Sequence, residues 1–300
     1  MGAAIKAEGL TMTYGDLRAV DDVSFEVYTG EFFGLLGPNG AGKTTILEMV
    51  EGLRKPQSGI VTIDGQEAWK RDPKLLRRMG VQLQLSSFFE RLNTREQLDI
   101  FGALYGVEDG RTEAMLEHVG LVDKADVRTE DLSGGQKQRL SLACALIHDP
   151  DIVFLDEPTA SLDPQARRNL WDLLRGLNES GRTVILTTHH MDEAEALCDR
   201  VAIMDAGKIL ELDTPAALIR DLDAPVRISV APGTIDAETA RSIAGVGDVS
   251  DDDSALMITT REPSRVLTEL ADRNALAGLS VKGASLEDVF LELTGREYRA

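Results

Sequence analysis

The stretch Gly37-Pro38-Asn39-Gly40-Ala41-Gly42-Lys43-Thr44-Thr45 matches the pattern G-x-x-x-x-G-K-[ST] in full. It follows the apolar run 32–36, which has the length of a buried strand, and a helical pattern begins at about Lys43. The glycines let the backbone wrap closely around phosphates, and the start of the helix adds partial positive charge. In this pattern Lys43 provides a charge for the β- and γ-phosphates, while the Thr44 hydroxyl reaches Mg²⁺. The whole stretch is therefore predicted to bind ATP, together with Mg²⁺.

A pair of carboxylates follows a second buried-strand candidate, residues 152–155. Asp156 and Glu157 come directly after this run and are followed by Pro158. Because ligands bind beyond the carboxyl ends of parallel strands, we expect both side chains beside the phosphate loop. Asp156 is expected to hold Mg²⁺ through water. Glu157 is expected to orient and polarise the attacking water, since phosphoryl transfer depends mainly on positioning and charge stabilisation.

A second candidate anion site lies in Leu132-Ser133-Gly134-Gly135-Gln136-Lys137-Gln138-Arg139, which opens a helical pattern that runs to His148. A Ser-Gly-Gly turn at a helix N-terminus presents backbone N–H groups to an anion. One nucleotide does not easily need both a complete phosphate loop and a second set of amides from the same subunit. We therefore expect two copies of the chain to share each nucleotide.

These motifs together resemble the ATP-binding cassette (ABC) family over residues 5 to about 215, and 132–139 is similar to the signature motif specific to it. The resemblance implies the cassette form of the P-loop NTPase fold, and ATP held between two head-to-tail chains. It implies that Ser133, Gly134 and Gly135 face nucleotide held by the partner chain, and that Asp163, in Ser161-Leu162-Asp163, lies in the loop crossing that interface.

The resemblance also implies roles for three single residues: Tyr14 stacks on adenine, Gln84 is a metal and catalytic residue that couples to a membrane partner, and His189 is the switch residue near the γ-phosphate. Each has an alternative. Tyr14 stands beside a glycine and could be a turn residue, and His189 could be structural. Gln82 competes with Gln84, whose spacing from Gly80 fits the family.

The net charge of −19 and the pI of about 4.6 argue against a large nucleic-acid-binding surface and against direct docking on anionic lipid. No apolar run approaches the ~20 residues that cross a bilayer, and the start of the chain lacks a secretory pattern. We therefore expect a cytoplasmic location. Cys144 and Cys198 are expected to be reduced, buried residues in helical segments.

Two domains are expected. Residues 1–220 alternate strand and helix patterns, which predicts an α/β domain with a largely parallel sheet and a helical subdomain at about 90–148. Residues 221–300 are predicted to form a small α+β domain of ferredoxin-like order β-α-β-β-α-β. Its elements are expected at 226–231, 236–244, 246–250, 255–260, 263–273 and 279–282. A last helix is expected after a capping pair, Ser285 and Asp288.

The run 284–296 resembles the C-terminal tail of cassettes that serve bacterial drug-type exporters. The leading hypothesis is therefore the ATPase subunit of an exporter of drug-like or hydrophobic compounds. It would act as a homodimer on a separate integral membrane permease, at the cytoplasmic face of the membrane. Residues 88–96 either contact that permease or pack inside the helical subdomain. The alternative is a soluble cassette ATPase that remodels macromolecules without a membrane partner.

Overall fold

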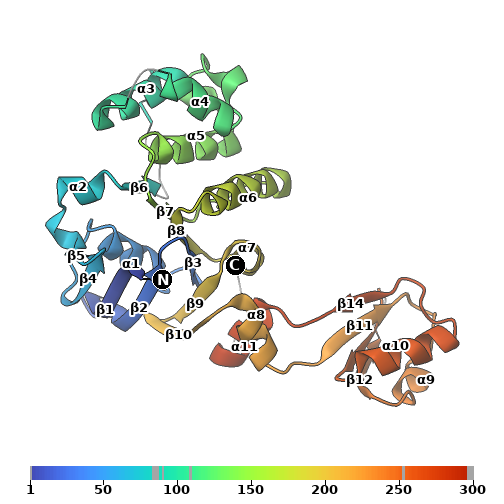
Figure 1. Cartoon of the computed structure of the whole chain (residues 1–300). Coiled ribbons are helices and arrows are strands. Elements are labelled where there is room, and N and C mark those ends of the chain that lie inside the picture. The colour runs from blue at the N-terminus through green and yellow to red at the C-terminus, as the bar shows by residue number, and fades with distance from the viewer. Residues whose placement is uncertain (1, 83–87, 90, 108–109, 252–253, 296–300) are drawn as a thin grey trace. The chain divides into compact units, whose positions relative to one another are not determined.

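The computed structural model describes residues 2–82, 88–89, 91–107, 110–251 and 254–295 (Figure 1). The described chain forms two compact units that divide between Pro215 and Ala216, a few residues before the predicted boundary at residue 220. Gln84 lies outside the described residues. Within them, every helix is too short or too polar to cross a membrane.

The first unit is built on a six-stranded sheet in the order β10-β9-β3-β8-β7-β6. Neighbouring strands are parallel except for β10, which pairs antiparallel with β9 at one edge. Strands β3, β7 and β8 are buried along their whole length, so they carry few exposed polar side chains. The strands are β3 (Phe32–Leu36), β6 (Met79–Gln82), β7 (Ile152–Asp156), β8 (Thr183–Thr188), β9 (Arg200–Asp205) and β10 (Lys208–Asp213). The predicted parallel sheet is confirmed.

A second, antiparallel sheet of four strands belongs to the same unit, in the order β2-β1-β4-β5. Its strands are β1 (Ala3–Tyr14), β2 (Leu17–Tyr28), β4 (Ser58–Ile63) and β5 (Gln66–Glu67). Helix α1 (Lys43–Val50) shares one continuous core with buried residues of both sheets. The phosphate-loop helix is therefore packed into the hydrophobic core of this unit. Two short helices, η1 (Ala68–Lys70) and α2 (Pro73–Leu76), lead from β5 back to β6.

The stretch between β6 and β7 is helical, as predicted for about 90–148. Its helices are α3 (Thr94–Tyr105), α4 (Arg111–His118) and α5 (Gly134–Leu146), with the short turns η2 (Val122–Lys124) and η3 (Thr129–Asp131) before α5. Figure 1 shows α3, α4 and α5 grouped as one subdomain. A capping box closes the start of α3, where Asn93 accepts from the backbone N–H of Glu96 and Glu96 accepts from that of Asn93.

Helices α6 (Pro164–Glu179) and α7 (Met191–Leu197) pack against the six-stranded sheet. Asp163 caps α6 by accepting from the backbone N–H groups of Gln165 and Ala166, 2.9 Å away in each case. Leu170, Leu174 and Leu177 of α6 are buried, whereas Leu173 is half-buried. Cys144 lies in α5 and Cys198 follows α7 rather than lying inside a helix; both are buried, unpaired thiols in the described chain.

The second unit begins with α8 (Pro215–Asp221) and has the predicted order of strands and helices: β11 (Val226–Val230), α9 (Ala237–Arg241), β12 (Val246–Asp251), β13 (Leu256–Thr260), α10 (Pro263–Asp272) and β14 (Ser280–Lys282). Its antiparallel sheet has the order β12-β13-β11-β14 over a separate core. Helix α11 (Leu286–Thr294) begins with the predicted Ser285–Asp288 capping box. Its inner face buries Leu286, Val289 and Phe290, whereas Leu293 is exposed.

Candidate active site

The phosphate loop joins the carboxyl end of β3 to the start of α1, and two of its glycines have no room for a side chain. A Cβ atom on Gly37 would lie 2.3 Å from the backbone oxygen of Met204 on β9. Gly42 has φ 99° and precedes the first residue of α1, and a Cβ there would lie 2.3 Å from the backbone oxygen of Ala19. These close approaches fix the course of the loop, so other residues at both positions would displace neighbouring backbone.

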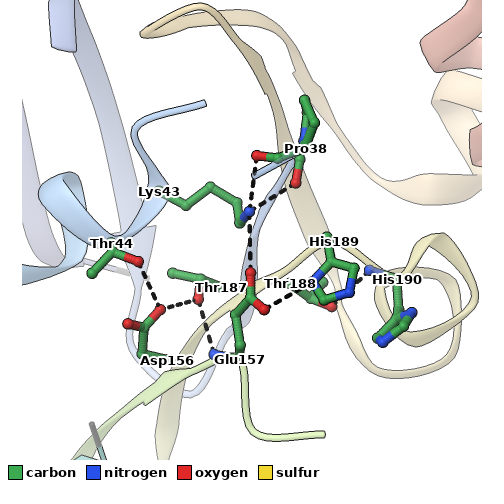
Figure 2. Close-up of polar contacts among 10 residues, drawn as sticks. Pro38, Lys43, Thr44, Asp156, Glu157, Thr187, Thr188, His189 and His190 are labelled. Atoms are coloured by element: carbon green, nitrogen blue, oxygen red, sulfur yellow. Dashed lines mark hydrogen bonds and ion pairs between the residues drawn. The ribbon is translucent and has the colours of Figure 1, made fainter. Parts of the chain in front are cut away.

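Lys43 is buried under this loop, with 4% of its side chain exposed. Its Nζ donates to the backbone oxygens of Gly37, at 2.8 Å, and Pro38, at 3.1 Å. It also lies 3.3 Å from Oε1 of Glu157, as Figure 2 shows. Burial lowers the pKa of Lys43, and the nearby Glu157 carboxylate acts in the opposite direction. The loop thus holds a single ammonium group against its own backbone, where β- and γ-phosphates are expected.

Thr44 and Asp156 meet below the loop, although 112 positions separate them in the sequence. Thr44 Oγ1 donates to Oδ1 of Asp156 at 3.2 Å, and the hydroxyl of Thr187, on β8, donates to the same oxygen. Burial raises the pKa of Asp156, and these two hydrogen bonds oppose that rise. The role of Thr187 was not predicted, because a threonine in a buried strand is usually a packing residue.

The predicted Mg²⁺ ligands fit the chemistry of that ion. A threonine hydroxyl and an aspartate carboxylate supply hard oxygen donors on one side of the loop. Within the described residues, no three His, Cys, Asp or Glu side chains gather into a complete metal cage. The two oxygen donors of Thr44 and Asp156 suit Mg²⁺, which commonly takes one or two protein oxygens and completes its shell with water and substrate phosphates.

Glu157 occupies the centre of the site, between Lys43 and His189 (Figure 2). Its Oε2 lies 2.8 Å from Nδ1 of His189, and its backbone N–H donates to Thr187 Oγ1 at 3.0 Å. Its φ of 48° is in the left-handed region, which a residue with a side chain rarely adopts and which carries a conformational cost. The end of β7 thus turns sharply and directs this carboxylate toward the residues that follow β3 and β8.

Tyr14 and the phosphate loop border the same hollow, whose volume is about 340 Å³. Its described lining consists of Tyr14, Leu17, Ala19, Asn39, Gly40, Gly42, Lys43, Thr44, Thr45 and Glu157. Tyr14 is 42% exposed and lines this hollow, so a ligand in the hollow can contact it. A volume of this size falls within the range of small-molecule sites.

The second predicted anion site lies in another hollow, of about 330 Å³. Its described lining consists of Ser133, Gly134, Gly135, Gln136, Arg139, Ser161, Leu162, Asp163, Ala166, Asn169 and Leu170. Ser133 caps α5, accepting from the Gln136 backbone N–H at 3.3 Å. The residues predicted to face a partner chain therefore lie together, and among the described lining residues the two hollows have none in common.

One further buried acid near the site was not predicted from the sequence. Glu193, in the first turn of α7 after His189 and His190, is fully buried and accepts from Trp171 Nε1 at 3.1 Å. Burial raises the pKa of Glu193. A glutamate in a polar-looking helix has no sequence signal that distinguishes a buried side chain from an exposed one. His190 is the N-cap of α7.

Comparisons with known proteins agree with this geometry. The family model described as ABC transporter matches residues 20–160. Nod factor export ATP-binding protein I of Rhizobium sp. (strain N33) is 40% identical over 298 residues, covering 98% of each chain. The protein of the same name from Cupriavidus metallidurans is 39% identical over 308 residues, covering 100% of each chain.

Solved structures also resemble much of the chain. The dimeric structure of MJ0796, a bacterial ABC transporter cassette, has a TM-score of 0.65 and 30% identity, and covers 70% of this chain and 98% of its own. The structure of cbiO1 from Clostridium perfringens, part of the ABC transporter complex cbiONQ, has a TM-score of 0.65 and 29% identity, and covers 74% and 95%. The chain therefore belongs to the ABC transporter family, as an ATP-binding and ATP-hydrolysing subunit.

Proposed function

We propose that this chain works as a homodimer that hydrolyses ATP with Mg²⁺ to power export through a separate membrane permease. The observation that carries the proposal is the position of the Glu157 carboxylate, which contacts Lys43 on one side and His189 on the other. These three residues follow three neighbouring strands of the parallel sheet, at the edge where such sheets bind ligands.

In the proposed reaction the triphosphate takes the place of Glu157 as the partner of Lys43, and the loop amides surround its β- and γ-phosphates. Glu157 then accepts a hydrogen bond from a water molecule and aims it at the γ-phosphorus. The water oxygen forms a bond to that phosphorus while the bond from phosphorus to the β–γ bridging oxygen breaks, and the protons of the water end on the released phosphate, giving ADP and inorganic phosphate. His189 holds Glu157 in place and donates toward the γ-phosphate. Bound through Thr44 and Asp156, Mg²⁺ would neutralise charge that develops on the phosphate oxygens.

The site is completed, in this proposal, by a second copy of the chain. Tyr14 and the phosphate loop border one hollow, whereas Ser133, Gly135 and Asp163 border another. A head-to-tail dimer would bring the second hollow of each chain against the nucleotide of its partner. The solved structure of the MJ0796 cassette is dimeric, which supports the part of this proposal that two chains associate. Closing and opening of the two chains would then be the step that ATP controls.

Three parts of the proposal are supported by the relatives: the permease, the direction of transport and the membrane location. The curated relatives are named as ATP-binding proteins for Nod factor export, and cbiO1 is described as part of a transporter complex. We infer that this chain binds the cytoplasmic face of a membrane through its permease, and not through lipid or nucleic acid, because its net charge is −19. The proposed cargo class is drug-like or hydrophobic compounds, and the permease would form the cargo path.

A pull-down from detergent-solubilised membranes tests the transporter role. The tagged full-length chain is expected to recover an integral membrane protein, and ATP with Mg²⁺ is expected to change the amount recovered. A Lys43→Ala chain serves as the matched control, because it should still recover the membrane protein but no longer respond to ATP. Recovery of nucleic acid or ribosomes without a membrane protein would overturn the proposal in favour of a macromolecule-remodelling ATPase.

A further inference from the structure

The ring of Tyr14 is in contact with a cation from a different part of the chain. The guanidinium carbon of Arg54 lies over this ring, 5.4 Å from its centroid. Tyr14 borders the phosphate-loop hollow, whereas Arg54 is not one of the described residues that line it. Arg54 therefore contacts the ring without lining the hollow, whereas Tyr14 lines the hollow and is 42% exposed.

Arg54 is itself fixed to the phosphate-loop helix. Its Nε lies 2.5 Å from Oε2 of Glu48, and its backbone N–H donates to the backbone oxygen of Glu48 at 3.0 Å. Glu48 stands one helical turn after Thr44 on α1. A charge-assisted hydrogen bond is stronger and more directional than a neutral one. A continuous series of contacts thus runs from the helix that begins at Lys43 to the aromatic ring.

The backbone beside Tyr14 is held by the same segment of chain. Oε1 of Gln57 accepts from the backbone N–H of Thr13 at 2.9 Å, and Nε2 of Gln57 donates to the backbone oxygen of Thr13 at 3.1 Å. The amide side chain therefore pairs with both polar groups of one residue, as a neighbouring strand would. Tyr14, the last residue of β1, pairs with Leu17 of β2, whereas the pairing of β1 with β4 stops at Thr11 and Ser58. Gln57, just before β4, therefore holds the strand beside Tyr14 where its pairing with β4 has ended.

We propose that Arg54 and Gln57 are positioning residues for the adenine base: they hold the Tyr14 ring at a set place relative to the phosphate loop. This inference rests on the proposed function, in which Tyr14 stacks on adenine. A ring that is already ordered loses less conformational freedom when the base arrives, so ATP binds more tightly. A ligand without a base gains nothing from the ring. Arg54 and Gln57 therefore select for nucleoside triphosphates over inorganic polyphosphate.

Titration calorimetry on the full-length chain, with ATP and with inorganic tripolyphosphate in the presence of Mg²⁺, tests the proposal. Arg54→Met is expected to weaken ATP binding roughly three- to tenfold and to leave tripolyphosphate binding unchanged. The Michaelis constant for ATP should rise by a similar factor, with kcat preserved. Arg220→Met is the control, because the Arg220 side chain is 74% exposed and belongs to the second unit. It should change the binding of neither ATP nor tripolyphosphate.

Two more variants separate positioning from simple charge. Glu48→Gln breaks the ion pair but makes the region more positive, so a charge effect would tighten ATP binding, whereas loss of positioning weakens it. Gln57→Ala removes the pairing with Thr13 without changing charge and should reproduce the Arg54→Met result. It also provides the test if Arg54→Met fails to fold, as judged by circular dichroism. Equal weakening of ATP and tripolyphosphate in these variants would overturn the proposal.

Tyr14→Ala distinguishes failure of this inference from failure of the proposed function. If Tyr14→Ala binds ATP as tightly as the parent chain, stacking on adenine is wrong, and the positioning role falls with it. If Tyr14→Ala weakens ATP binding but Arg54→Met and Gln57→Ala do not, stacking stands and the inference is overturned. The expected result is that all three weaken ATP binding, and that Arg54→Met has no further effect in the Tyr14→Ala chain.

Discussion

His189 Nδ1 lies 2.8 Å from Oε2 of Glu157, at the end of the six-stranded sheet where the phosphate loop also begins. The other carboxylate oxygen of Glu157 contacts Lys43, so one acid links the residues that follow three different strands. A group that must accept a hydrogen bond from water needs a fixed direction. In the proposed reaction the His189 contact supplies it after the triphosphate has replaced Glu157 as the partner of Lys43. We therefore propose that Glu157 is the residue that orients the attacking water.

Removal of the Glu157 charge should stop hydrolysis without stopping binding. Glu157→Gln keeps the shape of the side chain but makes it a poor partner for the attacking water, so kcat is expected to fall roughly 10²- to 10⁴-fold. ATP affinity should stay within a few-fold of the parent value. His189→Ala should also lower kcat, and should add little in the Glu157→Gln chain because both act on one group. A steady-state phosphate-release assay measures this; unchanged turnover in Glu157→Gln would contradict the mechanism.

Lys43→Ala should weaken ATP binding itself. A charge-assisted contact to a phosphate contributes about 1.5–3 kcal/mol, which corresponds to roughly a ten- to hundredfold loss of affinity. Calorimetry with ATP measures the change. Lys70→Ala is the control, because the Lys70 side chain is 74% exposed. Equal ATP affinities for the Lys43→Ala and parent chains would rule out the phosphate-loop assignment.

Glu51 should make the fold less stable as the pH rises. It is 2% exposed at the end of α1, and within the described chain neither carboxylate oxygen has a hydrogen-bond partner. Burial, with smaller contributions from Asp156 and Glu48, raises the pKa of Glu51 to about 8 from an ordinary 4.5. The folded chain therefore keeps a proton that the unfolded chain releases, and the free energy of unfolding falls between about pH 4.5 and 8.

Glu51→Gln should remove this contribution. At pH 7 the free energy of unfolding of the parent chain is on the order of 3 kcal/mol lower than at acidic pH, because each pKa unit corresponds to about 1.4 kcal/mol. Urea unfolding of both chains from pH 5.5 to 8.5 measures the difference in their free energies of unfolding. The variant should become increasingly more stable than the parent chain as the pH rises, until the difference levels off. Glu117→Gln, at an exposed position, should follow the parent chain. A constant difference across the pH range would show that Glu51 is already ionised in the folded chain at pH 5.5, so that burial does not raise its pKa.

Deletion of residues 221–300 should leave ATP binding intact. Tyr14, the phosphate loop and Glu157 all belong to the first unit, and the second unit has its own hydrophobic core. Calorimetry on the truncated chain should give an ATP affinity close to that of the full-length chain. A truncated chain that keeps its circular dichroism spectrum but binds no ATP would contradict this division.

The strand–loop–helix unit at the centre of the fold could be predicted well from local sequence. Residues 32–36 form β3 and α1 begins at Lys43, as predicted, because buried parallel strands read as apolar runs and the glycine pattern fixes the turn between them. The antiparallel sheet was missed. Its strands β1 and β4 pair over 47 or more positions of chain, as in the pairing of Thr11 with Ser58, and register shifts break their alternation.

The charged residues of the site could be predicted from the sequence, but the contacts that neutral or buried side chains make there could not. Lys43, Asp156, Glu157 and His189 meet as expected, because motif spacing places them at strand ends. The hydrogen bond from Thr187 to Asp156, and the contact of Arg54 with Tyr14, depend on tertiary packing that a single sequence does not encode in any short pattern. Whether Gln84 joins the site stays a prediction, because it lies outside the described residues.

The shared site is the central claim, and sedimentation of the Glu157→Gln chain with ATP and Mg²⁺ tests it most directly. We expect the Glu157→Gln chain to sediment as a dimer, of twice the 32.6 kDa chain mass, with ATP, and as a monomer with ADP. Gly135→Asp, added to the same chain, places a negative charge in the second hollow and should abolish the dimer while calorimetry still detects ATP binding. A Glu157→Gln chain that binds ATP yet stays monomeric would contradict the account.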